Sequence, residues 1–90
     1  MSSRRTKFET WAEVLEFCLR SKRTQTWLLR ETRLKTSAIK ENLQFLLSRN
    51  LIEQLDDEDI IQYQTTKRGE EALKRFYTLV TDFFDLNQNS

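Results

Sequence analysis

The chain has 90 residues, of which 38% are hydrophobic and 32% are charged, and its 15 Lys or Arg against 14 Asp or Glu leave a net charge of +1. Six Phe, two Trp and two Tyr exclude an intrinsically disordered chain, and the length allows one small domain with a marginal core. Residues 1–49 hold 11 basic and 5 acidic residues (net +6), whereas residues 50–90 hold 4 and 9 (net −5), so a negatively charged partner is expected at the first half.

The N-terminal part of the chain reads as a basic arm followed by a helix. Residues 1–7 are polar and without periodicity, so they are expected to be a flexible arm. From residue 8 to residue 19 apolar side chains recur at spacings of three and four, which predicts a helix with one buried face. Cys18 lies on that face, where a structural role is expected rather than a reactive thiol. Phe17 lies off this face, so a second element of the fold is expected to cover its side chain.

A short helix and a turn are expected next. Either Thr24 or Thr26 is suited to cap a helix that carries the apolar sequence WLL. Leu34 is expected to anchor the following turn in the core, and Thr36 or Ser37 to cap the next helix.

The third helix is expected to lead into a β-hairpin. Its buried stripe has the spacing i, i+4, i+7, i+8 and comprises Ile39, Leu43, Leu46 and Leu47. Asn50 is a plausible C-terminal stop. Residues 51–55 and 60–65 read as two strands, and the acidic residues 56–59 between them suit a turn.

The last predicted helix is unusually apolar. Thr66 is expected to cap it, and it should run to about residue 86, with residues 87–90 as a tail. Its apolar side chains cover about 180° of the helix surface, whereas one core needs only slightly more than about 100°. The excess predicts a homodimer through this helix, antiparallel in preference to parallel, with a short heptad-like spacing of about two heptads. The expected interface residues are Leu73, Phe76, Tyr77, Val80, Phe83 and Phe84.

Catalysis and cofactor binding are not expected. The chain has no His, one Cys and one Gly, so it lacks the usual general base, an internal zinc site and a glycine-rich phosphate loop. The acidic residues 56–59 lack the glycine and spacing of a calcium loop, so no metal is expected. No apolar run reaches the roughly 18 residues of a membrane span, and no signal-peptide pattern is present. We therefore expect a cytoplasmic, non-enzymatic protein in a reducing compartment.

The order helix, helix, helix, strand, strand, helix is that of a mainly α winged helix-turn-helix domain over residues 8–65, followed by a dimerisation helix over residues 66–86. The sequences NLQFLLSRNLI from Asn42 and YQTTKRGEEAL from Tyr63 resemble those of small archaeal winged-helix DNA-binding proteins and predicted transcriptional regulators that dimerise through a C-terminal coiled-coil helix. The resemblance implies binding of double-stranded DNA as a homodimer, associated with the nucleoid. Relatives commonly carry glycine or basic residues at the wing tip, where this chain is acidic.

If DNA is the ligand, the third helix is expected to enter the major groove. The candidate base-reading residues are Lys35, Thr36, Ser37, Lys40, Glu41 and Gln44. Gln44 suits adenine and Lys40 suits guanine, while Glu41 suits either acceptance from cytosine or repulsion of misplaced phosphates. The candidate phosphate contacts, with Lys35 again among them, are Arg4, Arg5, Lys22, Arg23, Arg30 and Arg33. The acidic wing is expected to point away from phosphate or to limit non-specific binding by repulsion.

The alternative is a protein-interaction module in which the winged helix is a scaffold. In that reading Trp11, Trp27, Phe17 or the last helix forms the partner surface. The near-neutral net charge and the acidic wing favour this alternative.

Overall fold

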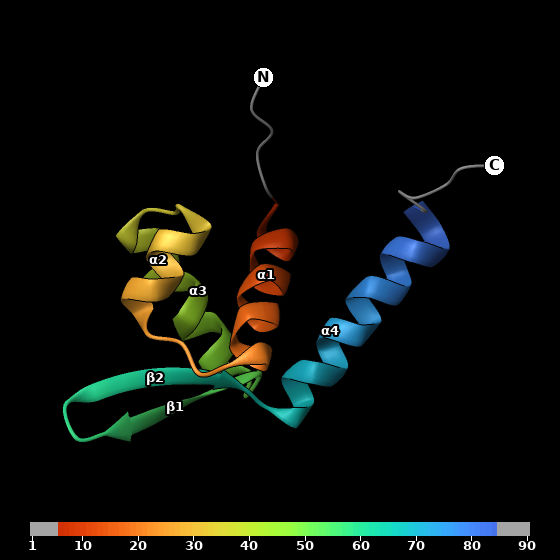
Figure 1. The fold of residues 1–90 in the computed structure, drawn as a ribbon. Helices are drawn as coiled ribbons and strands as arrows, with labels where there is room; N and C mark the ends of the chain where they lie inside the picture. The colour runs from red at the N-terminus through yellow and green to blue at the C-terminus, as the bar shows by residue number, and fades with distance from the viewer. Residues whose placement is uncertain (1–5, 85–90) are drawn as a thin grey trace.

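A computed structural model describes residues 6–84 of the chain. Within that range four helices and an antiparallel two-stranded sheet follow one another in the expected order, which confirms the mainly α winged helix-turn-helix class (Figure 1). The elements are α1 (Lys7–Arg20), α2 (Gln25–Thr32), α3 (Thr36–Ser48), β1 (Ile52–Asp57), β2 (Ile60–Thr65), α4 (Lys67–Leu79) and a π-helical turn (Val80–Phe84). Among these residues no helix is long and apolar enough to cross a membrane.

Helix α1 begins earlier than the sequence pattern indicated. Thr6 and Glu9 form a capping box, in which the Glu9 N–H donates to Thr6 Oγ1 at 3.1 Å and the Thr6 N–H donates to Glu9 Oε1 at 2.8 Å. Lys7 therefore belongs to the first turn of α1, so the expected arm over residues 1–7 is too long by two residues. The motif Thr-x-x-Glu was the available signal for this boundary.

The turn between α2 and α3 is made by backbone geometry. Thr24 is the cap of α2, because its Oγ1 accepts the Trp27 N–H at 3.1 Å. Arg33 ends α2 in the left-handed conformation with φ 60°, so the chain enters α3 after only three residues. The N-cap of α3 is Lys35, which makes no side-chain cap bond. The expected cap at Thr36 or Ser37 is thus wrong, since both residues already lie within the helix.

The core lies between α1, α3 and the start of α4, with α2 and the hairpin closing its sides. Its fully or nearly buried side chains include Val14, Leu15, Cys18, Leu28, Ile39, Leu43, Leu46, Ile52 and Leu73. Ring pairs extend this core outward. Trp11 stacks on Phe45 with centroids 4.2 Å apart, and Phe17 meets Trp27 edge to face at 5.0 Å. Helix α2, through Trp27, is therefore the second element that covers Phe17.

The wing is longer than expected. Strand β1 continues to Asp57, which pairs with Ile60, so only two residues form the turn. Glu58 takes the left-handed conformation, with φ 57°, that such a tight turn requires. Asp56 and Asp57 are therefore strand residues, and the expected strand end at residue 55 is wrong.

The junction before α4 ties this helix to the end of α3. The Thr66 hydroxyl donates to the Asn50 carbonyl oxygen at 2.7 Å and accepts the Gly69 N–H at 3.0 Å. Arg68 Nε donates to the Arg49 carbonyl oxygen at 3.0 Å. Asn50 itself has φ 61° and follows the C-cap of α3, in agreement with its predicted role as a stop. The sequence TTKRG thus fixes the direction in which α4 leaves the domain.

Gly69 permits a close approach of α4 to the start of β1. A Cβ atom at this position would overlap the Leu51 carbonyl oxygen and lie 2.7 Å from Thr65 Cγ2. Thr65 is held in turn by α1, because its buried hydroxyl donates to the Leu15 carbonyl oxygen at 2.7 Å. Only glycine fits this contact without a shift of the backbone.

Helix α4 extends away from α1 towards its C-terminal end (Figure 1). The regular α-helix ends at Leu79 and continues as the π-helical turn Val80–Phe84, so the chain is helical to the end of the described range, with a change of helix type at Val80 that the sequence pattern did not indicate. Residues 85 and 86 lie outside the described residues.

Candidate nucleic-acid interface

Helix α3 is firmly anchored by one face. Ile39, Leu43 and Leu46 are buried in the core, as the stripe predicted, while Leu47 is half-buried. The Asn42 amide also donates to the Ala38 carbonyl oxygen at 2.9 Å within the helix. The orientation of α3 about its own axis is therefore set by the core, and its other face is presented to solvent.

All six candidate base-reading residues are exposed. The set comprises Lys35, Thr36, Ser37, Lys40, Glu41 and Gln44. Counted at about 100° per residue, the five of them within α3 fall in an arc of about 140° whose centre lies about 120° from the centre of the buried stripe. The structure thus brings them together on one continuous face that begins at the N-terminal turn of the helix.

Three of the candidate phosphate contacts surround this helix pair. Lys22 lies exposed in the connector before α2, and Arg30 lies exposed in its last turn. Arg33 is exposed at the left-handed turn directly before α3. Arg4 and Arg5 lie outside the described residues.

Arg23 has a different role from the one expected. Its backbone pairs with Tyr63 of β2 through two hydrogen bonds of 3.0 and 2.7 Å. Its Nε donates to the Phe17 carbonyl oxygen at 3.0 Å, and its guanidinium lies 3.8 Å from the centre of the Trp27 ring. The half-buried Arg23 joins the connector to the wing and to α1, so it is removed from the candidate phosphate contacts.

Lys7 is a basic residue that the sequence pattern assigned to the arm. It lines a hollow of about 400 Å³ between α1 and α3, together with Glu41 of the exposed face of α3. Because α1 begins at Lys7, this exposed ammonium has a fixed attachment beside that face.

The acidic tip of the wing is exposed. Asp56, Asp57, Glu58 and Asp59 all face solvent, next to Ile60 and Ile61, whose side chains are 54% and 48% exposed. Four carboxylates repel a phosphate backbone by Coulomb's law. The two exposed isoleucines were not singled out in the sequence, because β-branched residues in a strand usually indicate burial.

The expected dimer residues of α4 and the π-helical turn differ in how far they are buried. Leu73 is only 3% exposed and belongs to the core of the protomer, so it is removed from the expected interface. Phe76 and Val80 are half-buried, while Tyr77 and Phe83 are exposed, Phe83 at 75%. The side chain of Phe84 lies outside the described residues.

Tyr77 also contacts its own α1. Its hydroxyl donates to Glu16 Oε1 at 2.9 Å. Partial burial raises the pKa of Tyr77, and the hydrogen bond to Glu16 raises it further. This contact links α1 to the last turn of α4.

Cys18 is inert in the folded state. Burial raises the pKa of its thiol from 9.0 to about 12, with the nearby Arg23 guanidinium opposing part of the rise. Within residues 6–84, moreover, His, Cys, Asp and Glu side chains nowhere form a group of three or more that could hold a metal ion.

The sequence matches the winged helix-turn-helix family over residues 4–82. Among solved structures, the transcriptional regulator BldR from Sulfolobus solfataricus is similar with a TM-score of 0.72 and 18% identity, over 89% of this chain and 63% of that chain. ZitR from Lactococcus lactis in complex with DNA is similar with a TM-score of 0.69 and 17% identity, over 87% of this chain and 54% of that chain.

HlyU from Vibrio cholerae is similar with a TM-score of 0.66 and 17% identity, over 79% of this chain and 76% of that chain. No curated protein matches the sequence. At these identities the structural likeness concerns the fold, and the chain spans only 63% and 54% of BldR and ZitR. The match over residues 4–82 covers most of the sequence, and the chain therefore belongs to the winged helix-turn-helix family.

Proposed function

We propose that this protein binds double-stranded DNA as a homodimer, with α3 in the major groove, and acts in the regulation of transcription. The observation that carries this proposal is the exposed polar face of α3, which starts at the helix N-terminus and is backed by three buried aliphatic side chains. A helix held in this way presents side chains to base edges in a fixed orientation. The DNA-bound ZitR structure, a protein of the same fold, supports this use of the fold.

Three side chains of this face have the chemistry for direct readout. Lys40 donates to the O6 and N7 acceptors of guanine, and Gln44 pairs with the N6 and N7 groups of adenine. Glu41 accepts from the N4 amino group of cytosine. Lys40 and Gln44 lie one helical turn apart, so they face neighbouring base pairs along the groove.

Phosphate contacts surround the reading face. Arg30, Arg33 and Lys22 are exposed around the helix pair, and Lys7 is fixed beside Glu41. Each of these cations that neutralises a phosphate releases a counterion, so binding weakens as salt increases. The acidic wing contributes repulsion instead, which restricts the protein to complexes in which the wing is directed away from the backbone.

The homodimer follows from α4. Tyr77, Leu79 and Phe83 remain exposed on this helix and its C-terminal extension, and large apolar side chains at a surface are typical of an interface. Two copies of α3 would then contact two half-sites, with a spacing set by α4.

The test is a titration of fluorescent duplex DNA, selected from a random pool, over about 50 to 200 mM salt. We expect log K to fall linearly with log of the salt concentration, and Arg33→Ala to reduce that slope by about 1. Lys40→Ala should weaken binding by about 1 to 3 kcal/mol and relax the preference at one base pair.

The matched control is Lys74→Ala, which removes one exposed cation from α4 on the other side of the domain (Figure 1). It should leave both affinity and slope unchanged. A folded protein that binds no duplex at about 50 mM salt would contradict DNA binding.

A second candidate is a protein-interaction scaffold. The exposed Ile60 and Ile61 beside the acidic tip favour it, because an apolar pair rimmed by charge is typical of a protein contact. Trp27 and Phe17 are half-buried against each other in a ring pair, and Trp11 is half-buried against Phe45, so they offer less exposed apolar surface than the two isoleucines. This candidate predicts that Ile60→Ser has a binding phenotype while Lys40→Ala has none.

A further inference from the structure

We propose that the apolar cavity between α1, α3 and α4 receives Phe83 of a second copy of this chain. The two α4 helices then pack antiparallel, and each copy fills the cavity of the other. This inference rests on the homodimer of the proposed function and specifies how the two copies meet.

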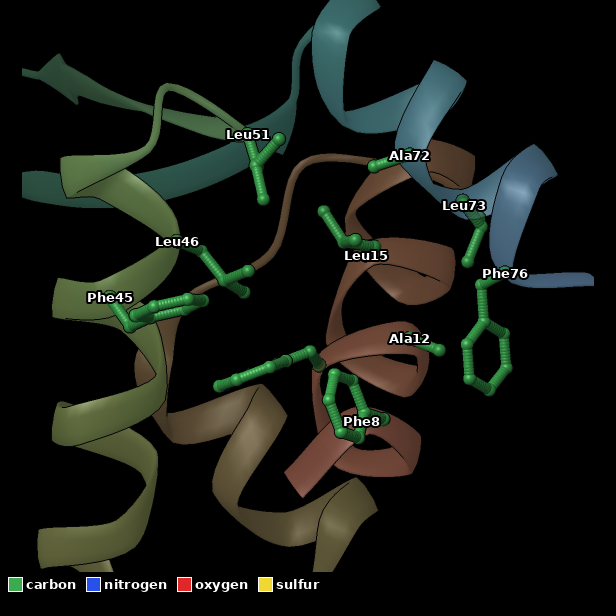
Figure 2. A pocket seen from close by; sticks show the side chains of 10 residues that line it. Phe8, Ala12, Leu15, Phe45, Leu46, Leu51, Ala72, Leu73 and Phe76 are labelled. Atoms are coloured by element: carbon green, nitrogen blue, oxygen red, sulfur yellow. The ribbon is translucent and has the colours of Figure 1, made fainter. Parts of the chain in front are cut away.

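The cavity has the size and lining of a site for one aromatic ring. It encloses about 150 Å³, and every lining side chain is apolar. Figure 2 shows these side chains converging from α1, α3 and α4. Prominent among them are Phe8, Trp11, Phe45, Leu46, Ala72 and Phe76. In other proteins an apolar cavity of about 150 Å³ holds a benzene molecule, so a phenyl side chain is a matching occupant.

The chain itself carries an aromatic ring that needs cover. Phe83 is 75% exposed and Leu79 is 48% exposed, although Leu79 belongs to the helix that forms one wall of the cavity and Phe83 to the π-helical turn that continues it. Counted at about 100° per residue around the helix axis, Leu79 and Phe83 lie within an arc of about 60° that also includes Ala72 and Phe76, the wall residues. The exposed stripe is therefore continuous with the cavity wall.

The spacing along α4 selects the antiparallel arrangement. Phe76 and Phe83 lie at nearly equal distances from the pair Leu79 and Val80, so a twofold axis there places Phe83 of the second copy opposite Phe76. The contact is then isologous and closed, because the same exchange occurs on both sides. In a parallel pair, Phe83 would instead face Phe83 of the second copy, about 10 Å along the helix from Phe76, and both cavities would stay open.

The cavity also reaches the reading helix. Phe45 and Leu46, which form its far wall, belong to α3 (Figure 2). A ring inserted between α4 and α3 would brace α3 against movement towards α4, so dimerisation supports the orientation of the helix proposed to read DNA. A substitution that weakens the dimer at this cavity should therefore also lower the affinity for DNA.

The test uses the full chain in a mixture of isotope-labelled and unlabelled protein. We expect intermolecular nuclear Overhauser effects from the Phe83 ring to the methyl groups of Leu46 and Ala12 on the other copy. Phe83→Ala should raise the dimer dissociation constant by at least about 100-fold in analytical ultracentrifugation, because each dimer loses two buried rings. The control Thr78→Ala, an exposed position on the opposite side of α4, should change it by less than about threefold.

A second variant tests the cavity independently of Phe83. Ala72→Leu adds side-chain volume at the cavity wall, so it should weaken the dimer while the monomer remains folded and as stable as before. This inference would be overturned, and the homodimer left intact, by two results together. The intermolecular nuclear Overhauser effects would join α4 to a different surface of the second copy, and Phe83→Ala would leave the dimer dissociation constant unchanged. A protein that stays monomeric near 1 mM, far above a typical specific dissociation constant, would contradict the homodimer itself.

Discussion

Gly69→Ala perturbs the junction that fixes α4 on the domain, and two effects of opposite sign compete there. In an exposed helix interior, alanine is about 1 kcal/mol more favourable than glycine. At this position the added Cβ would overlap the Leu51 carbonyl oxygen and crowd Thr65 Cγ2. The Leu51 atom belongs to the backbone, so a side-chain rotation cannot relieve the contact, and the start of α4 must move.

The movement would strain several hydrogen bonds at once. The Thr66 N–H donates to the same Leu51 carbonyl oxygen at 3.0 Å, and the Thr66 hydroxyl bridges Asn50 and Gly69. Overpacking typically costs about 1 to 3 kcal/mol, and each weakened hydrogen bond about 1 kcal/mol. After subtraction of the helix-propensity gain, we expect a net destabilisation of about 3 to 5 kcal/mol, a large part of the stability of a domain this size.

Urea unfolding monitored by tryptophan fluorescence measures this change. The matched control is Thr78→Ala at an exposed position in the last turn of α4, where alanine should stabilise by a few tenths of a kcal/mol. If Gly69→Ala is as stable as the wild type or more so, the close packing of α4 against β1 is wrong.

Two further predictions concern buried polar groups. Because burial raises the pKa of Cys18 to about 12, the thiol is protonated in the folded state while the unfolded thiol ionises above about pH 9, so stability should fall as pH rises beyond 9. Relative to Cys18→Ala, the wild type should lose about 1 kcal/mol of unfolding free energy between neutral pH and pH 10. Thiol reagents should modify Cys18 in urea but not in the native protein. If the stabilities of the two proteins depend on pH in the same way, the raised pKa of Cys18 is wrong. Thr65→Val removes the hydroxyl that donates to Leu15 and should cost about 1 kcal/mol in the same urea assay; an unchanged midpoint would show that the bond contributes nothing.

The sequence predicted the elements well where local chemistry decides them. Apolar spacing located the helices and the buried stripe of α3, and the hydroxyls of Thr24 and Thr66 do cap their helices. Strand β2 was predicted with its observed bounds, residues 60–65. Each of these features depends on side chains close to one another in the chain.

The errors arose where distant parts of the chain decide the outcome. Arg23 is basic and near other basic residues, yet its contacts with Phe17, Trp27 and Tyr63 are tertiary and leave no local pattern. Burial of Leu73 and exposure of Phe83 depend on the direction in which α4 leaves the junction. A helical wheel alone contains no information about that direction.

The sequence pattern also did not predict the left-handed backbone conformations at the turns. Arg33 and Glu58 both adopt positive φ values although neither is glycine or asparagine. In each case the geometry of the flanking elements imposes the turn. That is why the start of α3 and the length of β1 were misplaced by one or two residues.

The most direct measurement of the central claim is a titration of isotope-labelled protein with duplex DNA, followed by the backbone amide resonances. If α3 reads the major groove, the largest shifts will fall on Thr36, Ser37 and Lys40 and on the turn at Arg33, with small changes at the acidic tip of the wing. Shifts concentrated at Ile60 and Ile61, with the amides of α3 unchanged, would contradict the proposed reading face.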